Sequence, residues 1–207
     1  MVSKDKVIID FKPVSPKDGD LFRGRDPIEV ARRLERIGIL GLSVVTESDN
    51  FGGSLKLLRD ICSEVELPVL RKDFIKTEAD LSETIEAGAK GVLLIVAAAP
   101  NISELYKRST ELGLSPVVEV HTAKEMEIAK NMGAKIISIN NKNIIDLERD
   151  NGTIATTADL IRLAPKDAFI ISASGIADHD DAQKALNSGA DAVLVGTAFW
   201  KGGFEII

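Results

Sequence analysis

The sequence predicts an α/β protein, a (β/α)₈ TIM barrel, and three observations lead to this prediction. Short runs rich in Val and Ile recur along the chain, and most are apolar almost throughout. Such runs are typical of parallel strands that are covered on both faces. Segments with helical periodicity separate the runs, and the runs number eight, as a closed barrel of this class requires. We therefore expect a single barrel domain over residues 1–207.

The predicted strands follow one another at intervals that each hold one strand and one helix. They are VIIDF (7–11), GLSVVTE (41–47), PVLRKDF (68–74), GVLLIVA (91–97), PVVEVH (116–121), KIISINN (135–141), AFIISAS (168–174) and AVLVGT (192–197). An open doubly wound sheet is the alternative, and it predicts a Gly-rich phosphate turn after the first strand. The segment FKPVSPKDGD (11–20) is not such a turn. The strand count and this segment favour the closed barrel.

The predicted helices carry recognisable ends. They cover 26–38, 54–65, 77–89, 101–113, 122–134, 157–164 and 178–190. The first shows the pattern best, with Asp26 as N-cap, Pro27 at the first helical position and Gly38 at the end. Only FWKGGFEII (199–207) follows the last strand, and its adjacent glycines exclude a full helix. We expect a truncated C-terminal helix, in a monomer or in a homodimer that covers the missing part.

Composition excludes several classes of function. The net charge is −6, and the 26 Lys and Arg residues are scattered among 32 Asp and Glu. Nucleic acids and anionic membranes require clustered positive charge, so we expect neither as a partner. Cys62 is the only cysteine, which excludes an internal disulfide and suits a reducing, cytoplasmic location. No apolar run approaches the roughly 18 residues of a membrane span, and the first residues are not typical of a signal peptide.

Polar residues collect at the predicted strand ends, where reactive groups lie in barrels of this class. They are Lys12, Glu47, Lys72, Glu119, Asn140, Ser174 and Gly196–Thr197. Lysines and carboxylates that converge there can tune one another for acid–base catalysis. The plainer alternatives are a solvated lysine at position 72 and loop-capping side chains at Glu47 and Asn140. Arg71 and Asp73 alternate away from Lys72, so we interpret them as structural partners outside the pocket.

These segments also carry a family resemblance. PVLRKDFI resembles the third-strand signature of the indole-3-glycerol phosphate synthase family of tryptophan biosynthesis, and FKPVSP is similar to its first-strand segment. VVEVHT, SINNKNI, SASGI and DAVLVGTAFW resemble the ends of strands five to eight. The resemblance runs from about residue 7 to residue 200. It implies a lyase that closes an indole ring with loss of carbon dioxide and water, without a metal or an organic cofactor.

The resemblance implies a role for each matching residue. The substrate would be 1-(2-carboxyphenylamino)-1-deoxyribulose 5-phosphate. Lys72 would protonate the ketone oxygen, Lys12 would hold the carboxylate and assist dehydration, and Glu119 would be the partner acid or base. Other residues would support these groups or bind substrate: Glu47, Asn140, Asp10, Phe74, Ser15, Lys142, Ser174, Gly175, Gly196 and Thr197. Small residues at strand ends also suit phosphate, because backbone N–H groups at helix starts attract anions.

Four departures from the family pattern keep two alternatives open. Asp10 stands where glutamate is usual, Ala173 replaces a glutamate, and Lys142 replaces an arginine. The family's N-terminal extension, which adds a helix over the mouth, is also missing, so we expect the mouth to close differently. The alternatives are a phosphosugar isomerase, which would need a cysteine at position 12, and a barrel that binds a phosphorylated metabolite without turnover.

Overall fold

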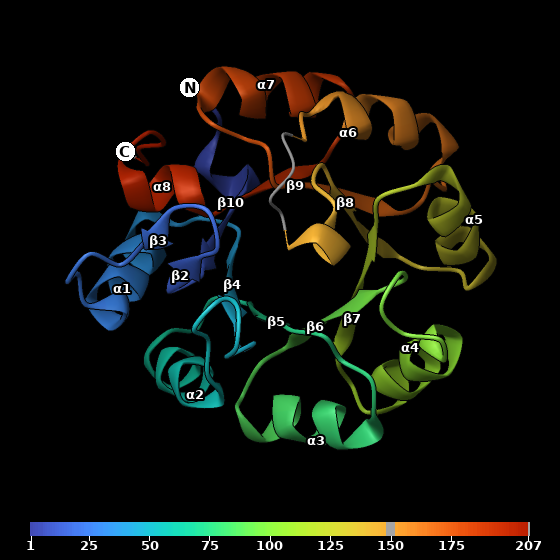
Figure 1. The fold of residues 1–207 in the computed structure, drawn as a ribbon, viewed down its shortest axis with the longest axis horizontal. Coiled ribbons are helices and arrows are strands. Elements are labelled where there is room, and N and C mark those ends of the chain that lie inside the picture. The colour runs from blue at the N-terminus through green and yellow to red at the C-terminus, as the bar shows by residue number, and fades with distance from the viewer. Residues whose placement is uncertain (148–151, 207) are drawn as a thin grey trace.

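The computed structural model describes residues 1–147 and 152–206 and contains a closed barrel of parallel strands ringed by helices (Figure 1). The barrel strands are β1 (Val7–Phe11), β4 (Gly41–Val45), β5 (Val69–Lys72), β6 (Gly91–Ile95), β7 (Ser115–Val120), β8 (Ile136–Asn140), β9 (Phe169–Ala173) and β10 (Ala192–Val195). Strand β1 pairs in parallel with both β4 and β10, which closes the ring. The predicted barrel is confirmed, and the open-sheet alternative is wrong.

The helices lie outside the strands and begin close to the predicted positions. They are α1 (Pro27–Ile37), α2 (Leu55–Glu64), α3 (Glu78–Glu86), α4 (Ile102–Glu111), α5 (Ala123–Asn131), α6 (Ala155–Leu160), α7 (His179–Asn187) and α8 (Thr197–Lys201). Asp26 caps α1 by accepting a hydrogen bond from the backbone N–H of Ile28, and Gly38 ends it with a φ of 82°. Short 3₁₀ turns, η1 (Lys4–Lys6), η2 (Ile144–Asp146) and η3 (Ile161–Leu163), complete the connections.

Two features distinguish the first and the last βα unit of the chain. After β1 the chain forms a small antiparallel hairpin, β2 (Val14–Ser15) and β3 (Gly19–Asp20), in a segment where the sequence predicts no strand. At the other end, α8 has five residues, so the expected truncation of the last helix is confirmed. Trp200 of α8, together with Phe204 and Ile206 in the tail beyond it, is buried in the core cluster between strands and helices.

Alternation along the strands separates two apolar regions. One set of side chains, including Ile8, Leu70 and Leu194, fills the barrel interior. Their neighbours, including Ile9 and Val69, pack outward against the helices. Successive residues of a strand point to opposite faces. Any residue an even number of positions beyond an interior residue therefore points to the barrel axis, and near the carboxyl ends it points into the mouth.

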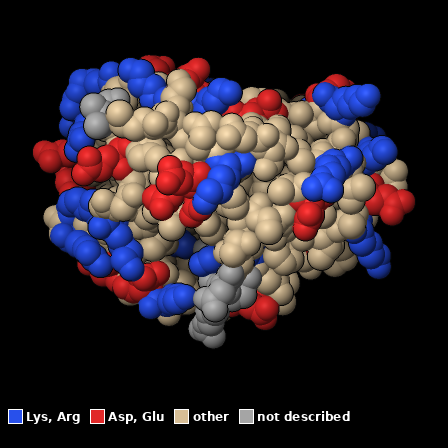
Figure 2. Space-filling model, turned by 90° about the horizontal axis from the view of Figure 1, so that it is seen from above, with Lys and Arg blue, Asp and Glu red and all other residues tan. Residues whose placement is uncertain are grey.

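Charges of both signs are mixed on the face of the molecule that Figure 2 shows. Figure 2 shows Lys and Arg side chains interspersed with Asp and Glu on the face in view. Across residues 1–147 and 152–206, no helix combines the length and apolar character needed to cross a membrane.

Candidate active site

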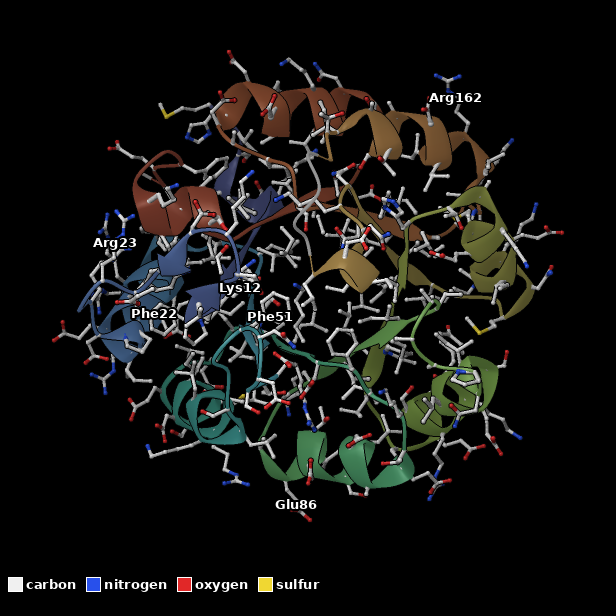
Figure 3. The ribbon with its side chains drawn as sticks, viewed as in Figure 1. Lys12, Phe22, Arg23, Phe51, Glu86 and Arg162 are labelled. Carbon is white, nitrogen blue, oxygen red and sulfur yellow. The ribbon has the colours of Figure 1, made fainter. Side chains whose placement is uncertain are left out.

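The mouth of the barrel holds charged side chains that alternation turns inward. Lys12 follows β1, Lys72 is the last residue of β5, and Glu119 lies near the end of β7. Their exposed fractions are only 4%, 8% and 2%. Figure 3 shows Lys12 and Phe51 side by side near the barrel centre, and the Lys12 ammonium lies 5.4 Å from the Phe51 ring centroid. Ionic interactions are stronger here than at the surface, because little water screens them.

Asp10 is the partner of Lys72. Its Oδ2 lies 3.7 Å from the Lys72 Nζ, and its Oδ1 accepts a 2.7 Å hydrogen bond from the Ser43 hydroxyl. Both Asp10 and Ser43 are buried. The carboxylate is thus fixed on one side by a neutral donor and faces the ammonium on the other. A charged pair held in this way keeps Lys72 pointed across the mouth.

Glu119 is oriented by the end of β8. The Asn140 side-chain amide donates to Glu119 Oε1 at 3.1 Å, and the Asn140 Oδ1 accepts from the backbone N–H of Lys142 at 3.0 Å. The His121 Nδ1 lies 2.8 Å from the carbonyl oxygen of Asn140. Asn140 therefore links the carboxylate to the following loop. This is an orienting position, although the same bonds also stabilise the loop.

Glu47 lies beyond the end of β4, and its contacts favour the loop-capping interpretation. Its carboxylate accepts hydrogen bonds of 2.9 to 3.2 Å from the backbone N–H groups of Asn50 and Phe51 and from the Asn50 side chain. Glu47 also borders a small cavity with Phe74, Lys72 and Glu119. The cavity volume is about 20 Å³, room for about one water molecule. An aryl ring enters only when these walls move.

A larger cavity of about 550 Å³ occupies the other side of the mouth. Its lining includes Asp10, Lys12, Lys142, Ser174, Gly175, Gly196 and Thr197. A Cβ at position 196 would lie 3.3 Å from the Asp10 Cβ, so the chain at Gly196 packs closely on the Asp10 side chain. The Asp10–Lys72 pair joins the two cavities, because Asp10 borders the larger one and Lys72 the smaller one.

The hairpin forms one rim of the larger cavity. Lys201 of α8 donates a 2.7 Å hydrogen bond to Asp18, and this bond holds the pKa of the Asp18 carboxyl below its ordinary value. The Ser15 hydroxyl donates to Asp18 Oδ2 at 3.2 Å. Ser15, predicted to bind phosphate, is thus directed to the hairpin's own carboxylate.

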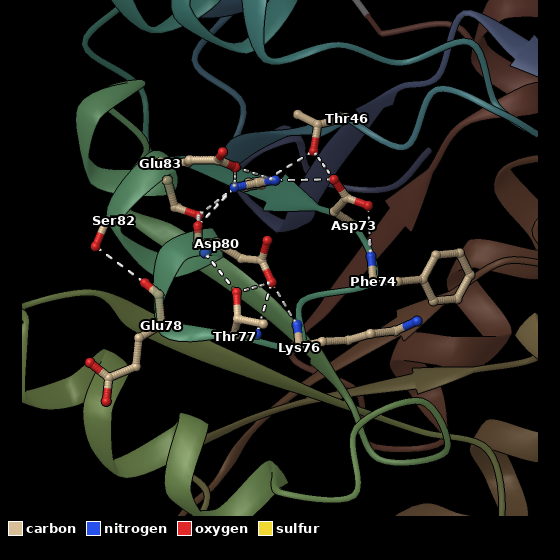
Figure 4. Close-up of polar contacts among 11 residues, drawn as sticks. Thr46, Asp73, Phe74, Lys76, Thr77, Glu78, Asp80, Ser82 and Glu83 are labelled. Carbon is tan, nitrogen blue, oxygen red and sulfur yellow. Dashed lines mark hydrogen bonds and ion pairs between the residues drawn. The ribbon is translucent and has the colours of Figure 1, made fainter.

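Arg71 lies outside the mouth, as alternation along the strand predicts. The same prediction is wrong for Asp73, which borders the small cavity beside Lys72 and Phe74. Arg71 is 4% exposed and donates hydrogen bonds to the Thr46 hydroxyl, the Asp80 carbonyl and the Thr84 hydroxyl, at 2.9, 2.8 and 3.2 Å. It also pairs with Asp73 at 3.2 Å. Figure 4 shows this cluster between β5 and α3. The two charges are structural and tie the strand end to its helix.

Sequence reasoning missed several residues that support the site. Ser43 is a lone hydroxyl in the apolar strand GLSVV, and Asn141 directly follows Asn140. A polar side chain in or next to a buried strand needs a hydrogen-bond partner, so the residue types at both positions indicate a role in supporting the site. No sequence signal pairs Asp18 with Lys201, since 182 residues separate them. In the described part of the chain, no group of three or more His, Cys, Asp or Glu is arranged to hold a metal ion.

A family model and similar sequences agree on one family. A family model described as indole-3-glycerol phosphate synthase matches residues 2–203. A relative of that name from Pyrococcus abyssi is 44% identical, covering 96% of this chain and 87% of the relative. One from Kineococcus radiotolerans is 42% identical, covering 95% of this chain and 72% of the relative. The solved structure of an N-acetylmannosamine-6-phosphate 2-epimerase from Clostridium perfringens superposes with a TM-score of 0.74 at 15% identity, covering 94% and 87% of the two chains. That likeness reflects the fold alone.

Proposed function

The chain belongs to the indole-3-glycerol phosphate synthase family, and from this premise we propose that it is a carboxy-lyase of tryptophan biosynthesis. It converts 1-(2-carboxyphenylamino)-1-deoxyribulose 5-phosphate to indole-3-glycerol phosphate, carbon dioxide and water. The proposal takes residues 1–207 as one catalytic domain. With a single cysteine and a biosynthetic reaction, it also places the protein in the cytoplasm.

The observation that carries the proposal is the buried convergence of Lys72 and Asp10 with Lys12 and Glu119 between the two cavities. The reaction needs an acid at a ketone, a cation for a carboxylate and a further acid–base pair. The substrate's two ends match the two cavities in character. Its aryl group suits the side walled by Phe74, and its phosphate suits the side lined by Ser174, Gly175, Gly196 and Thr197.

Ring closure is the first step in this scheme. The aryl carbon that bears the carboxylate attacks the ketone carbon, and the ketone oxygen takes a proton from the Lys72 ammonium. Asp10 keeps this ammonium in place at 3.7 Å. Loss of carbon dioxide returns the electron pair to the ring. An acid positioned at a developing oxyanion contributes typically 10²- to 10⁴-fold in rate, as an order of magnitude.

Dehydration completes the indole. The new hydroxyl leaves as water with a proton from Lys12, and Glu119 removes a proton from the neighbouring carbon. Asn140 orients Glu119 for this task through the 3.1 Å hydrogen bond. Because Ala173 offers no carboxylate, the proposal assigns the base role to Glu119 alone. Lys142 contributes positive charge on the phosphate side.

An assay with purified protein tests the proposal. Incubation with the carboxyphenylamino-deoxyribulose phosphate should produce the fluorescence of an indole. Lys72→Ala should lower kcat about 10²- to 10⁴-fold, since it removes the general acid. Lys107→Ala, at an exposed lysine of α4, is the matched control and should retain wild-type activity.

Each other outcome points elsewhere. If the protein binds the substrate but forms no fluorescent product, and Lys72→Ala changes nothing, the lyase proposal is rejected. The protein would then be a barrel that binds a phosphorylated metabolite without turnover. Isomerisation of a phosphosugar would support the isomerase class. The family assignment favours neither alternative.

A further inference from the structure

Asn141 directly follows β8, is fully buried and binds the turn whose residues Ser174 and Gly175 line the larger cavity. Its side-chain nitrogen lies 3.0 Å from each of three acceptors: the Ser172 hydroxyl, the Ala173 carbonyl and the Ser174 carbonyl. Its backbone N–H also donates to the Ala173 carbonyl at 2.8 Å. One residue of β8's end thus binds three consecutive residues at the end of β9.

The turn that it binds has an unusual backbone. Ser174 and Gly175 have φ values of 62° and 67°. A non-glycine residue in this region is strained and persists only where the surroundings hold it. The Asn141 amide provides such support, because it binds the carbonyl groups on both sides of the Ser174 nitrogen and α-carbon. A Cβ at position 175 would lie 3.3 Å from the Asn141 Cβ, so the turn also packs closely on this residue.

The orientation of the Asn141 amide is fixed from its other side. Its Oδ1 accepts hydrogen bonds from the Thr157 backbone N–H at 3.0 Å and from the Thr157 hydroxyl at 2.9 Å. A backbone N–H can only donate, so the oxygen must face Thr157 and the nitrogen must face the turn. Thr157 and Ser172 are fully buried, and their hydroxyl oxygens lie 2.7 Å apart.

We propose that Asn141 is a positioning residue for substrate phosphate: together with Thr157, it holds the Ser174–Gly175 turn in the conformation that binds the phosphate group. The proposal deepens the proposed function and rests on its phosphate side. It separates Asn141 from Asn140, whose amide faces Glu119 at the chemical end of the mouth. Loss of Asn141 should therefore affect the phosphate end of the substrate and spare the reacting atoms.

Paired variants and paired substrates test this inference. Asn141→Asp keeps the shape and replaces the N–H donors with an acceptor. Thr157→Val removes the hydroxyl that orients Asn141, and Thr157→Ser retains it. Ser109→Ala is the control, because Ser109 is equally buried but lies on α4. Each protein is assayed for kcat and KM with the phosphorylated substrate and with the same compound lacking its phosphate. The thermal shift caused by inorganic phosphate reports binding without turnover.

Asn141→Asp should raise KM for the phosphorylated substrate about 10- to 100-fold, as expected for lost hydrogen bonds in a charged site, with little change in kcat. Its kinetics with the phosphate-free compound should match those of the wild type. Thr157→Val should show the same pattern more weakly, and Thr157→Ser should restore wild-type values.

Equal losses with both substrates, or an unchanged phosphate-induced thermal shift in Asn141→Asp, would overturn the inference. If Asn141→Asp does not fold, the Thr157 pair decides by the same criteria. If the wild type binds phosphate but forms no indole, the proposed function fails while the phosphate shift still tests Asn141.

Discussion

At the scale of single residues, neighbouring charged residues of one strand have different roles because their side chains point to opposite faces. In β5, the Arg71 side chain points outward and donates hydrogen bonds to Thr46 and to Thr84 of α3. Lys72, the next residue, points into the mouth. A slip of one residue would exchange the two faces. The sequence RKD therefore carries a structural anchor and a candidate acid in adjacent positions.

Asp10→Asn tests the partner of the candidate acid. The change keeps the shape but removes the negative charge 3.7 Å from Lys72. Misplacement of a catalytic group by about 1 Å can cost roughly 100-fold, so we expect kcat to fall by about 10- to 100-fold with a smaller change in KM. Steady-state kinetics with the phosphorylated substrate measure this. Asp60→Asn, on exposed α2, is the control, and equal activity of the two variants would show that Asp10 is not needed.

At the scale of elements, the hairpin β2–β3 is attached to the opposite end of the chain. Lys201 of α8 binds Asp18, and Arg25 donates a hydrogen bond to the Trp200 carbonyl. Both contacts join the loop after β1 to the helix after β10, on neighbouring strands of the barrel. They form a rim that borders the phosphate side of the mouth.

The Asp18–Lys201 contact should stabilise the protein in a pH-dependent manner. The Lys201 hydrogen bond lowers the pKa of Asp18 in the folded state. The contribution of this contact to the free energy of unfolding is therefore fully present above the pKa of Asp18 in the unfolded chain, about 3.9. It is lost as pH falls through the lower pKa of Asp18 in the folded protein. Because both side chains are partly exposed, Asp18→Asn should lower the free energy of unfolding at pH 7 by only about 0.2–1 kcal/mol, and by less in 1 M salt.

Urea unfolding of wild type and Asp18→Asn at low and high salt measures this difference. Asp167→Asn removes the more exposed pair with Lys135 and should have a smaller effect. A difference between wild type and Asp18→Asn that persists unchanged below pH 3 would contradict the assignment.

At the scale of the whole molecule, the short tail completes the shell around the barrel. Trp200 is 1% exposed, packs against Phe11 and Phe22, and donates from its indole nitrogen to the Asp10 carbonyl at 2.8 Å. The last helix therefore contacts the first strand at the backbone of Asp10, a proposed active-site residue.

Trp200→Ala should lower the free energy of unfolding by about 3–5 kcal/mol, as loss of a large buried side chain does. Trp200→Phe should cost less, since it retains most of the packing and loses the hydrogen bond to Asp10, worth roughly 0.5–1.5 kcal/mol. Denaturant unfolding followed by circular dichroism measures both. A cost below 1 kcal/mol for Trp200→Ala would show that the tail does not support the barrel.

Most of the fold could be predicted from sequence because it depends on local patterns. The strand starts fall within one residue of their predicted positions, and Asp26, Pro27 and Gly38 act at α1 as their types suggest. The hairpin could not be predicted, since its strands have two residues each and no apolar pattern. In the candidate site, alternation along the strands predicts which side chains face the mouth, as at Lys72 and Glu119.

Sequence alone determined the barrel class, the positions of the strand ends and the charges that arrive there, because apolar runs and helix caps act over a few neighbouring residues. Only the tertiary structure decided which partners those charges meet. Asp10 meets Ser43 and Lys72, Glu47 turns to its own loop, and Asn141 supports the turn after β9. These outcomes depend on closure of the ring, which brings together strand ends that are far apart along the chain and whose separations no local pattern specifies.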